Sequence, residues 1–212
     1  TLDLGAGYKP VVSQDFLRDT PTHPRPTRRN LQRILPRYEP VSHMNIEIPY
    51  TPRPGQAQLH GELQAKRWGV VVCHRRWGKT VMAINHLLRD AVLNSKPNPR
   101  FAYIAPTYRQ AKAVAWDYLK QFAGAVPMVR FHETELRADL PNGARIQLLG
   151  AENPDSLRGI YLDGAVLDEM ADMPESLFPE IIRPALSDRK GWSLFIGTPR
   201  GHNAFFDLYT AA

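Results

Sequence analysis

Residues 70–80 have the sequence VVVCHRRWGKT, and this stretch decides the fold of the chain. Its three valines predict a buried β-strand, because β-branched residues favour strands. A short basic loop follows, and Gly78-Lys79-Thr80 begins a helix whose apolar residues continue to position 88. A strand, a loop and a helix N-terminus form a site for phosphate, since backbone N–H groups and the positive end of the helix dipole face the anion.

The loop follows the nucleotide-binding pattern GxxxxGK[ST] with one departure. In that pattern the lysine reaches the β- and γ-phosphates and the hydroxyl residue ligates Mg²⁺. Lys79 and Thr80 occupy these positions, whereas Cys73 stands where the first glycine is expected. A plain strand, turn and helix with a basic turn is the alternative interpretation. We predict a site for ATP and Mg²⁺, in which the other loop residues that contact the nucleotide are Arg75, Arg76, Trp77 and Gly78.

Composition agrees with a soluble α/β domain that has extensions. The chain has 212 residues, a formal net charge of +6 and a sequence pI near 9.6, which favours a polyanionic partner. No apolar run approaches the roughly 18 residues that span a bilayer. No secretory signal is visible and the single Cys73 cannot form an intrachain disulfide, so we expect a reducing cytoplasm and no membrane partner.

Residues 1–49 are expected to form an extended arm, and residues 50–212 the globular domain. Nine of the 19 prolines lie within the first 54 residues, a density that prevents long helices. Two origins stay open. The segment is either a natural arm that grips nucleic acid or a neighbouring subunit, or a vector- or fusion-derived segment with Met44 as the true start. Its basic patch consists of Arg25, Arg28, Arg29, Arg33 and Arg37.

A helix is expected to begin at Gln56, after Arg53-Pro54-Gly55, with Leu59, Leu63 and Trp68 on one side. A glutamine just upstream of a phosphate loop can recognise adenine, because its amide both donates and accepts. A solvated residue at a helix start is the alternative.

Strands and helices alternate after the phosphate loop. A second strand is predicted at residues 101–105 and an amphipathic helix at 108–122. Such alternation predicts parallel strands with right-handed crossovers, so we expect a twisted, mostly parallel sheet between two layers of helices. The apolar residues on one side of that helix are predicted to lie in the core. They are Ala111, Val114, Ala115, Tyr118, Leu119 and Phe122.

An antiparallel extension is predicted at residues 129–149. Three short segments there alternate apolar and polar residues, and Pro141-Asn142-Gly143 joins the last two. This composition is typical of a hairpin turn. His132 and Glu133 are expected to be isolated surface residues.

Two carboxylates end the next strand, at residues 164–169. Asp168 can hold Mg²⁺, directly or through water, and Glu169 can orient or deprotonate the attacking water. A further buried strand at residues 192–196 leads to Gly197-Thr198-Pro199-Arg200-Gly201. Ligands bind at the carboxyl ends of such strands, so Thr198 is expected near the γ-phosphate. A simple Gly-Thr-Pro turn is the alternative.

The motifs together resemble the ATPase domain of the large terminase of tailed bacteriophages, the motor that packages DNA into the prohead. The likeness is carried by Gln56 after Arg-Pro-Gly, the loop CHRRWGKT, the segment VLDE at 166–169 and FIGTPRG at 195–201. The segment 104–107, IAPT, also resembles a helicase motif that contacts the DNA backbone. The resemblance covers about residues 50–210 and implies an ASCE-type P-loop NTPase fold.

The resemblance also implies a role for each matching residue. Arg75 would be the arginine of the phosphate loop, with Arg76 as the substitute. Arg158 lies eleven residues before Glu169, where terminases carry an arginine finger for the neighbouring subunit. The remaining roles are adenine recognition by Gln56, phosphate and metal binding by Lys79, Thr80 and Asp168, catalysis by Glu169 and coupling of hydrolysis to movement by Thr198.

The implied function is a Mg²⁺-dependent ATPase that drives sequence-independent translocation of double-stranded DNA. Expected partners are the portal protein, the small terminase subunit and further copies in a ring, expected to be a pentamer on the prohead and a monomer in solution. Its place would be the host cytoplasm, outside the mature virion. No nuclease activity is expected, because the chain ends soon after the coupling motif. The alternatives are a helicase-like remodelling ATPase, a nucleotide-binding assembly module and, least favoured, a small-molecule kinase.

Overall fold

The computed structural model describes residues 46–198 and 204–211. These residues belong to one compact unit, Asn45–Ala212. The basic patch of the predicted arm and the segment Pro199-Arg200-Gly201 lie outside the described residues. Within the part of the chain that the structure describes, no helix has the length and apolar character needed to cross a bilayer.

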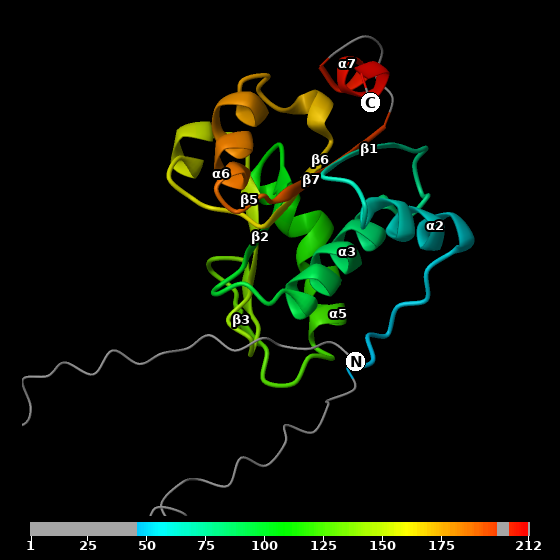
Figure 1. The fold of residues 1–212 in the computed structure, drawn as a ribbon, viewed down its shortest axis with the longest axis vertical. Coiled ribbons are helices and arrows are strands. Elements are labelled where there is room, and N and C mark those ends of the chain that lie inside the picture. The colour runs from blue at the N-terminus through cyan, green and yellow to red at the C-terminus, as the bar shows by residue number, and fades with distance from the viewer. Residues whose placement is uncertain (1–45, 199–203, 212) are drawn as a thin grey trace, which may run out of the picture. The chain divides into compact units, whose positions relative to one another are not determined.

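A mixed β-sheet forms the centre of the unit (Figure 1). In the described residues it has seven strands in the order β1-β7-β6-β2-β5-β4-β3. The first five strands in this order run parallel to one another. β4 pairs antiparallel with β5, and β3 pairs antiparallel with β4. This arrangement confirms the predicted sheet and its hairpin extension. The strands are β1 (Trp68–Val72), β2 (Arg100–Ala105), β3 (Arg130–His132), β4 (Arg137–Asp139), β5 (Arg145–Gly150), β6 (Gly164–Asp168) and β7 (Trp192–Gly197).

Helices cover both faces of the parallel part. Figure 1 shows α3 and α5 on one side of the strands and α6 on the other. Alternate residues of β2 therefore enter different cores: Tyr103 packs with α3, whereas Ile104 packs with α6. Burial on both faces explains the nearly continuous apolar runs of these strands. The helices are α2 (Pro54–Leu63), α3 (Lys79–Leu93), α4 (Tyr108–Ala111), α5 (Asp117–Ala123), α6 (Arg183–Ser187) and α7 (Ala204–Ala211).

Several shorter helical segments connect these elements. A π-helical segment, Lys112–Trp116, joins α4 to α5, and a second, Leu177–Ile182, leads into α6. Two 3₁₀ turns, Pro154–Leu157 and Met170–Asp172, flank β6. The chain after Pro174 thus forms a π-helical segment followed by α6.

The predicted core stripe of residues 108–122 was partly wrong, because a π-helical segment interrupts the helix. Ala111, Ala115, Leu119 and Phe122 are buried as expected, but Val114 is 42% and Tyr118 40% exposed. Trp116, absent from the predicted stripe, is buried instead. A π turn contains an extra residue, which rotates the side chains that follow it.

Two further predictions about position were wrong. Trp68 does not continue the face of α2, because that helix ends at Leu63 and Trp68 begins β1. Glu133 is not isolated, since its carboxylate accepts a hydrogen bond of 2.7 Å from the Trp116 indole and contacts Lys120 at 3.3 Å. His132 likewise pairs with Asp139, at 3.1 Å. His132 thus links β3 to β4, whereas Glu133 links the extension to the π-helical segment and α5.

Candidate nucleotide-binding site

The phosphate loop lies between the end of β1 and the start of α3. Gly78 caps α3 with a left-handed backbone (φ 92°), and its carbonyl accepts the Met82 N–H at 3.0 Å. A Cβ on Gly78 would lie 2.7 Å from Nε2 of Gln56. Both the backbone angle and the lack of space require glycine here, so the loop conformation follows from the Gly-Lys-Thr motif.

Gln56 supports this loop from α2. Its side chain is buried, and its Nε2 donates to the carbonyls of Gly78 at 3.2 Å and Trp77 at 3.5 Å. Its Oε1 accepts the backbone N–H of Arg53 at 3.0 Å, which closes the first turn of α2. The Gln56 amide, which the sequence analysis expects to recognise adenine, thus stabilises the phosphate loop. Recognition of adenine by Gln56 remains a prediction.

Three predicted residues meet at the carboxyl ends of neighbouring strands. Nζ of Lys79 donates to the Thr198 hydroxyl at 3.5 Å, and that hydroxyl lies 3.2 Å from Oε1 of Glu169. Lys79 also donates to the carbonyls of Cys73 and His74, at 3.1 and 3.4 Å. The lysine and the carboxylate therefore share one cleft.

Glu169 has an unusual backbone. β6 ends at Asp168, and Glu169 then takes a left-handed conformation with φ 55° and ψ 50°. Its N–H still donates to the Ile196 carbonyl of β7, at 2.9 Å. A residue other than glycine in this region is strained, and such strain persists where the surrounding structure fixes the chain. The turn directs the Glu169 side chain toward Thr198, the residue that follows β7.

Asp168 is the buried acid of the site, with only 6% of its surface exposed. Burial raises its pKa to about 6, while a hydrogen bond from the Tyr103 hydroxyl acts in the opposite direction. Lys79 also lowers the pKa of this carboxyl, whereas Glu169 raises it. Sequence reasoning missed Tyr103, because a tyrosine within an apolar strand gives no signal of a polar role.

A cleft of about 350 Å³ connects these groups. The loop residues Arg75 and Arg76 are exposed at its rim, whereas Trp77 is outside its lining and accepts a hydrogen bond from Arg53 through its carbonyl. Val114 and Tyr118, which the π-helical segment rotates out of the core, form an apolar wall that the sequence did not predict. The lining comprises Arg75, Arg76, Gly78, Lys79, Thr80, Val81, Ala105, Pro106, Gln110, Val114, Tyr118, Asp168, Glu169 and Thr198.

Comparison with known proteins identifies the family. Residues 74–212 match the family model described as terminase large subunit, T4likevirus-type, N-terminal. This range includes the phosphate loop from His74 onward, the Asp168-Glu169 pair and Thr198. The chain belongs to the terminase large subunit family.

Individual terminases agree with this assignment. The chain is 30% identical over 179 residues to the large subunit of Thermus virus P23-45, covering 76% of this chain and 36% of the relative. It is 28% identical over 176 residues to that of Escherichia phage T5, covering 80% and 39%. The solved ATPase domain of the Thermus phage P74-26 large terminase has a TM-score of 0.64 and 30% identity, over 76% of this chain and 70% of that one. The chain thus spans less than half the length of these curated relatives.

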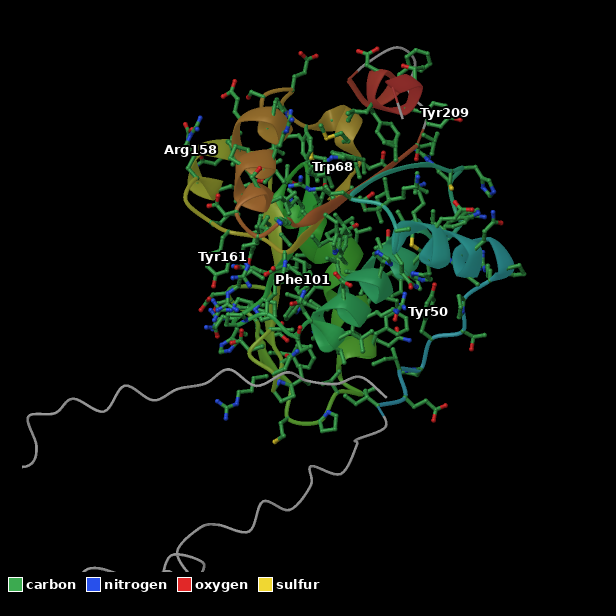
Figure 2. All side chains as sticks on the ribbon, in the orientation of Figure 1. Tyr50, Trp68, Phe101, Arg158, Tyr161 and Tyr209 are labelled. Carbon is green, nitrogen blue, oxygen red and sulfur yellow. The ribbon has the colours of Figure 1, made fainter. Side chains whose placement is uncertain are left out.

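One predicted site residue of this terminase chain lies elsewhere. Arg158 is outside the lining of the cleft and projects at the edge of the molecule, on the side of the view opposite α2 (Figure 2). Its guanidinium pairs with Asp155 at 2.8 Å and Glu180 at 3.7 Å. Arg158 therefore does not reach the phosphate loop of its own chain.

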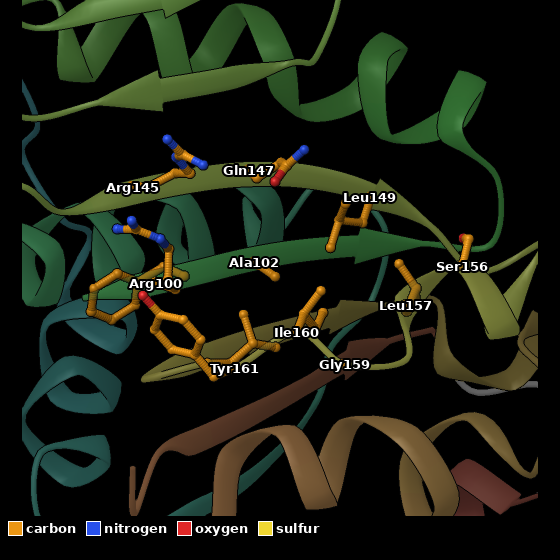
Figure 3. A pocket seen from close by; sticks show the side chains of 12 residues that line it. Arg100, Ala102, Arg145, Gln147, Leu149, Ser156, Leu157, Gly159, Ile160 and Tyr161 are labelled. Carbon is orange, nitrogen blue, oxygen red and sulfur yellow. The ribbon is translucent and has the colours of Figure 1, made fainter. Parts of the chain in front are cut away.

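A second cavity of about 340 Å³ adjoins the segment that carries Arg158 (Figure 3). Ser156, Leu157 and Gly159 line one part of it, and Arg100 and Arg145 line another. These two arginines have partners within the chain, since Arg145 pairs with Asp139 and Arg100 donates to the Gly143 carbonyl. The cavity is separate from the cleft, and none of the predicted site residues lines it.

Proposed function

We propose that residues 50–212 form the Mg²⁺-dependent ATPase motor domain of a terminase, which couples ATP hydrolysis to packaging of double-stranded DNA into a prohead. The observation that carries this proposal is the contact series from Lys79 through Thr198 to Glu169, with Asp168 beside it. It combines a phosphate-binding cation with a carboxylate at the carboxyl ends of three adjacent strands, where an open α/β sheet binds its ligands.

The donor atoms fit ATP and Mg²⁺. Thr80 and Asp168 offer hydroxyl and carboxylate oxygens to the same cleft, and Mg²⁺ prefers oxygen ligands while sharing the rest of its sphere with water and phosphate. Thr80 and Asp168 would hold Mg²⁺, which would supply positive charge against the negative charge that develops during phosphoryl transfer. Lys79 and the exposed Arg75, with Arg76 as its substitute, would bind the phosphate oxygens.

Glu169 is the proposed catalytic carboxylate. Thr198 holds it in place, so that it orients the water that attacks the γ-phosphorus and accepts its proton. Thr198 also contacts Lys79. Loss of the γ-phosphate would change both contacts of Thr198 at once, which suits a residue that couples hydrolysis to movement.

Arg158 is proposed to act on the next subunit of a ring. Its exposed position, away from its own cleft, supports a role between subunits. An arginine finger stabilises the charge of the transition state and contributes about 10³–10⁵ to kcat in NTPases. The proposed assembly is a ring, expected to be a pentamer, on the portal of the prohead, with the small terminase subunit as a further partner. It would act in the host cytoplasm.

DNA contacts are proposed to be independent of sequence and directed to phosphates. The net charge of +6 supports a polyanionic partner. Arg109 of α4 and Lys112 of the π-helical segment, both exposed, are the candidates among the described residues. The arginines of the arm are candidates outside them. The similarity to terminases does not favour the helicase-like alternative.

Phosphate release by the whole chain, with and without double-stranded DNA, tests the proposal. We expect hydrolysis that requires Mg²⁺, disappears in Lys79→Ala and increases with DNA of any sequence. A chain that binds ATP without measurable release under all these conditions would instead be a nucleotide-binding assembly module. Strand separation coupled to hydrolysis would favour the helicase-like alternative.

A further inference from the structure

A single tyrosine hydroxyl connects the two proposed metal ligands of this site. Tyr103 lies on β2, directly beside Val166 of β6. Asp168 is two residues further along β6 and so faces the same side of the sheet. The Tyr103 side chain reaches diagonally from β2 to this position of β6, and its hydroxyl donates a hydrogen bond to Oδ2 of Asp168. The Thr80 hydroxyl lies near the same tyrosine oxygen and lowers the pKa of that tyrosine.

Packing alone does not account for this hydroxyl. Tyr103 has 0% of its surface exposed, and Phe101, two residues earlier on the same face of β2, fills its place in this core with a ring that has no polar atom. Burying a hydroxyl costs free energy unless it finds a hydrogen-bond partner. Here the partner is Asp168, a residue proposed to hold the cation.

We infer that Tyr103 is a positioning residue that holds Asp168 and Thr80 in the geometry that binds Mg²⁺. This inference rests on the proposed function of the cleft. Among the described residues, Tyr103 is the side chain whose hydrogen bond restrains the Asp168 carboxylate. A free carboxylate would rotate, and the cation would lose affinity as a result. Residues that orient metal ligands in this way typically change metal affinity by about 10–100-fold.

The test is direct metal binding to the whole chain, with Mn²⁺ as a spectroscopic probe and a non-hydrolysable ATP analogue present. Tyr103→Phe is expected to weaken Mn²⁺ binding roughly tenfold while nucleotide binding without metal stays unchanged. The matched control is Tyr108→Phe, which removes the same atom from a tyrosine outside the cleft, whose hydroxyl donates to the Thr134 carbonyl at 2.8 Å. This control should bind Mn²⁺ like the wild type.

Asp168→Asn separates failure of the inference from failure of the proposed function. If Asp168→Asn abolishes Mn²⁺ binding and Tyr103→Phe leaves it unchanged, the positioning role is overturned while the metal site stands. If Asp168→Asn has no effect either, the proposed site itself is wrong. If Tyr103 acts through Asp168, the double variant should bind no worse than Asp168→Asn alone.

A second measurement covers the case in which Tyr103→Phe does not fold. Fluorotyrosine at position 103 gives a fluorine resonance that reports on the hydroxyl and its partners. Addition of Mg²⁺ in the presence of the ATP analogue should shift this resonance, because the cation would be bound by the Asp168 carboxylate that accepts the tyrosine hydrogen bond. An unchanged resonance at saturating Mg²⁺ overturns the inference.

Discussion

Thr198 holds both oxygens of the Glu169 carboxylate. Its backbone N–H donates to Oε2 at 3.3 Å, and its hydroxyl lies 3.2 Å from Oε1. Two contacts from one residue fix the plane of the carboxylate, and they place it beside Lys79, which also contacts the Thr198 hydroxyl. The orientation of the proposed catalytic group thus depends on the end of the neighbouring strand.

Replacing the proposed catalytic carboxylate should separate binding from hydrolysis. Glu169→Gln keeps the shape of the side chain and an oxygen that can accept from Thr198, but it cannot accept a proton. We expect nucleotide affinity close to that of the wild type and a loss of turnover of about 10²–10⁴-fold. Equilibrium binding of a fluorescent ATP analogue and phosphate release measure the two effects. Wild-type turnover would exclude Glu169 from the chemistry.

The Thr198 hydroxyl should matter for turnover more than for affinity. Thr198→Val removes the contacts to Lys79 and to Oε1 of Glu169 but keeps the backbone N–H and the branched shape. Hydrogen bonds to charged groups contribute about 1.5–3 kcal/mol, so a loss in kcat of roughly tenfold or more is expected. Thr198→Ser retains the hydroxyl and serves as the control. Equal kcat values for the valine and serine variants would mean that the hydroxyl has no such role.

The phosphate loop and the ends of β6 and β7 could be predicted because their signals are local. Gly78 needs its left-handed angle, Lys79 follows it directly, and Asp168 and Thr198 end apolar runs that form parallel strands. In a parallel sheet the carboxyl ends of all strands lie at one edge, so these residues meet without any further information. Sequence spacing was therefore sufficient to place them together.

The apolar wall of the cleft could not be predicted, because it depends on a tertiary contact. The Trp116 indole donates to Glu133, which lies 17 residues away and beyond α5. Trp116 is buried with this partner in the π-helical segment, which contains one extra residue in its turn. Val114 and Tyr118 therefore face the cleft at the phosphate loop and not the core. A regular helical period counts 3.6 residues per turn and places these two side chains in the core.

Two inactive variants should restore activity when they are mixed, if Arg158 acts between subunits. A Lys79→Ala subunit still carries an intact arginine finger, and an Arg158→Ala subunit still carries an intact phosphate loop. An interface in which the first subunit inserts its finger into the second therefore has both groups. Random mixing of equal amounts gives such a pair at roughly a quarter of the head-to-tail interfaces of a ring. Phosphate release is measured for each variant and for the mixture, under conditions in which the wild type assembles.

The double variant Lys79→Ala/Arg158→Ala provides the control for this mixing experiment. It donates no finger, so its mixture with Arg158→Ala should stay inactive. A mixture of the two single variants that is no more active than either alone, from chains that assemble normally, would contradict a role between subunits. An Arg158→Ala chain with wild-type turnover would remove the arginine from the mechanism altogether.

The stability of the domain should fall below neutral pH because of His86. This histidine is 6% exposed, its ring stacks on His60, and its edge meets Trp192. Burial, His60 and Arg89 lower its pKa to about 4, against about 6.5 in an unfolded chain. Between these values the unfolded state binds the extra proton, so the contribution of His86 to stability is complete above pH 6.5 and decreases toward pH 4. This contribution falls by about 2 kcal/mol between pH 7.5 and pH 5. Asp168, whose pKa is raised to about 6, acts in the opposite direction over the same range and offsets part of the loss.

Chemical denaturation at pH 7.5 and pH 5 measures this effect. His86→Phe keeps a ring in the same place without a titrating group, so its free energy of unfolding should depend less on pH than that of the wild type, whatever its absolute stability. His74→Gln is the matched control, because it removes an exposed imidazole outside the buried contact of His86 with His60 and Trp192. His60, whose pKa is also lowered by burial, retains part of the dependence in His86→Phe. An identical pH dependence in His86→Phe and the wild type would show that the buried imidazole is not the group responsible.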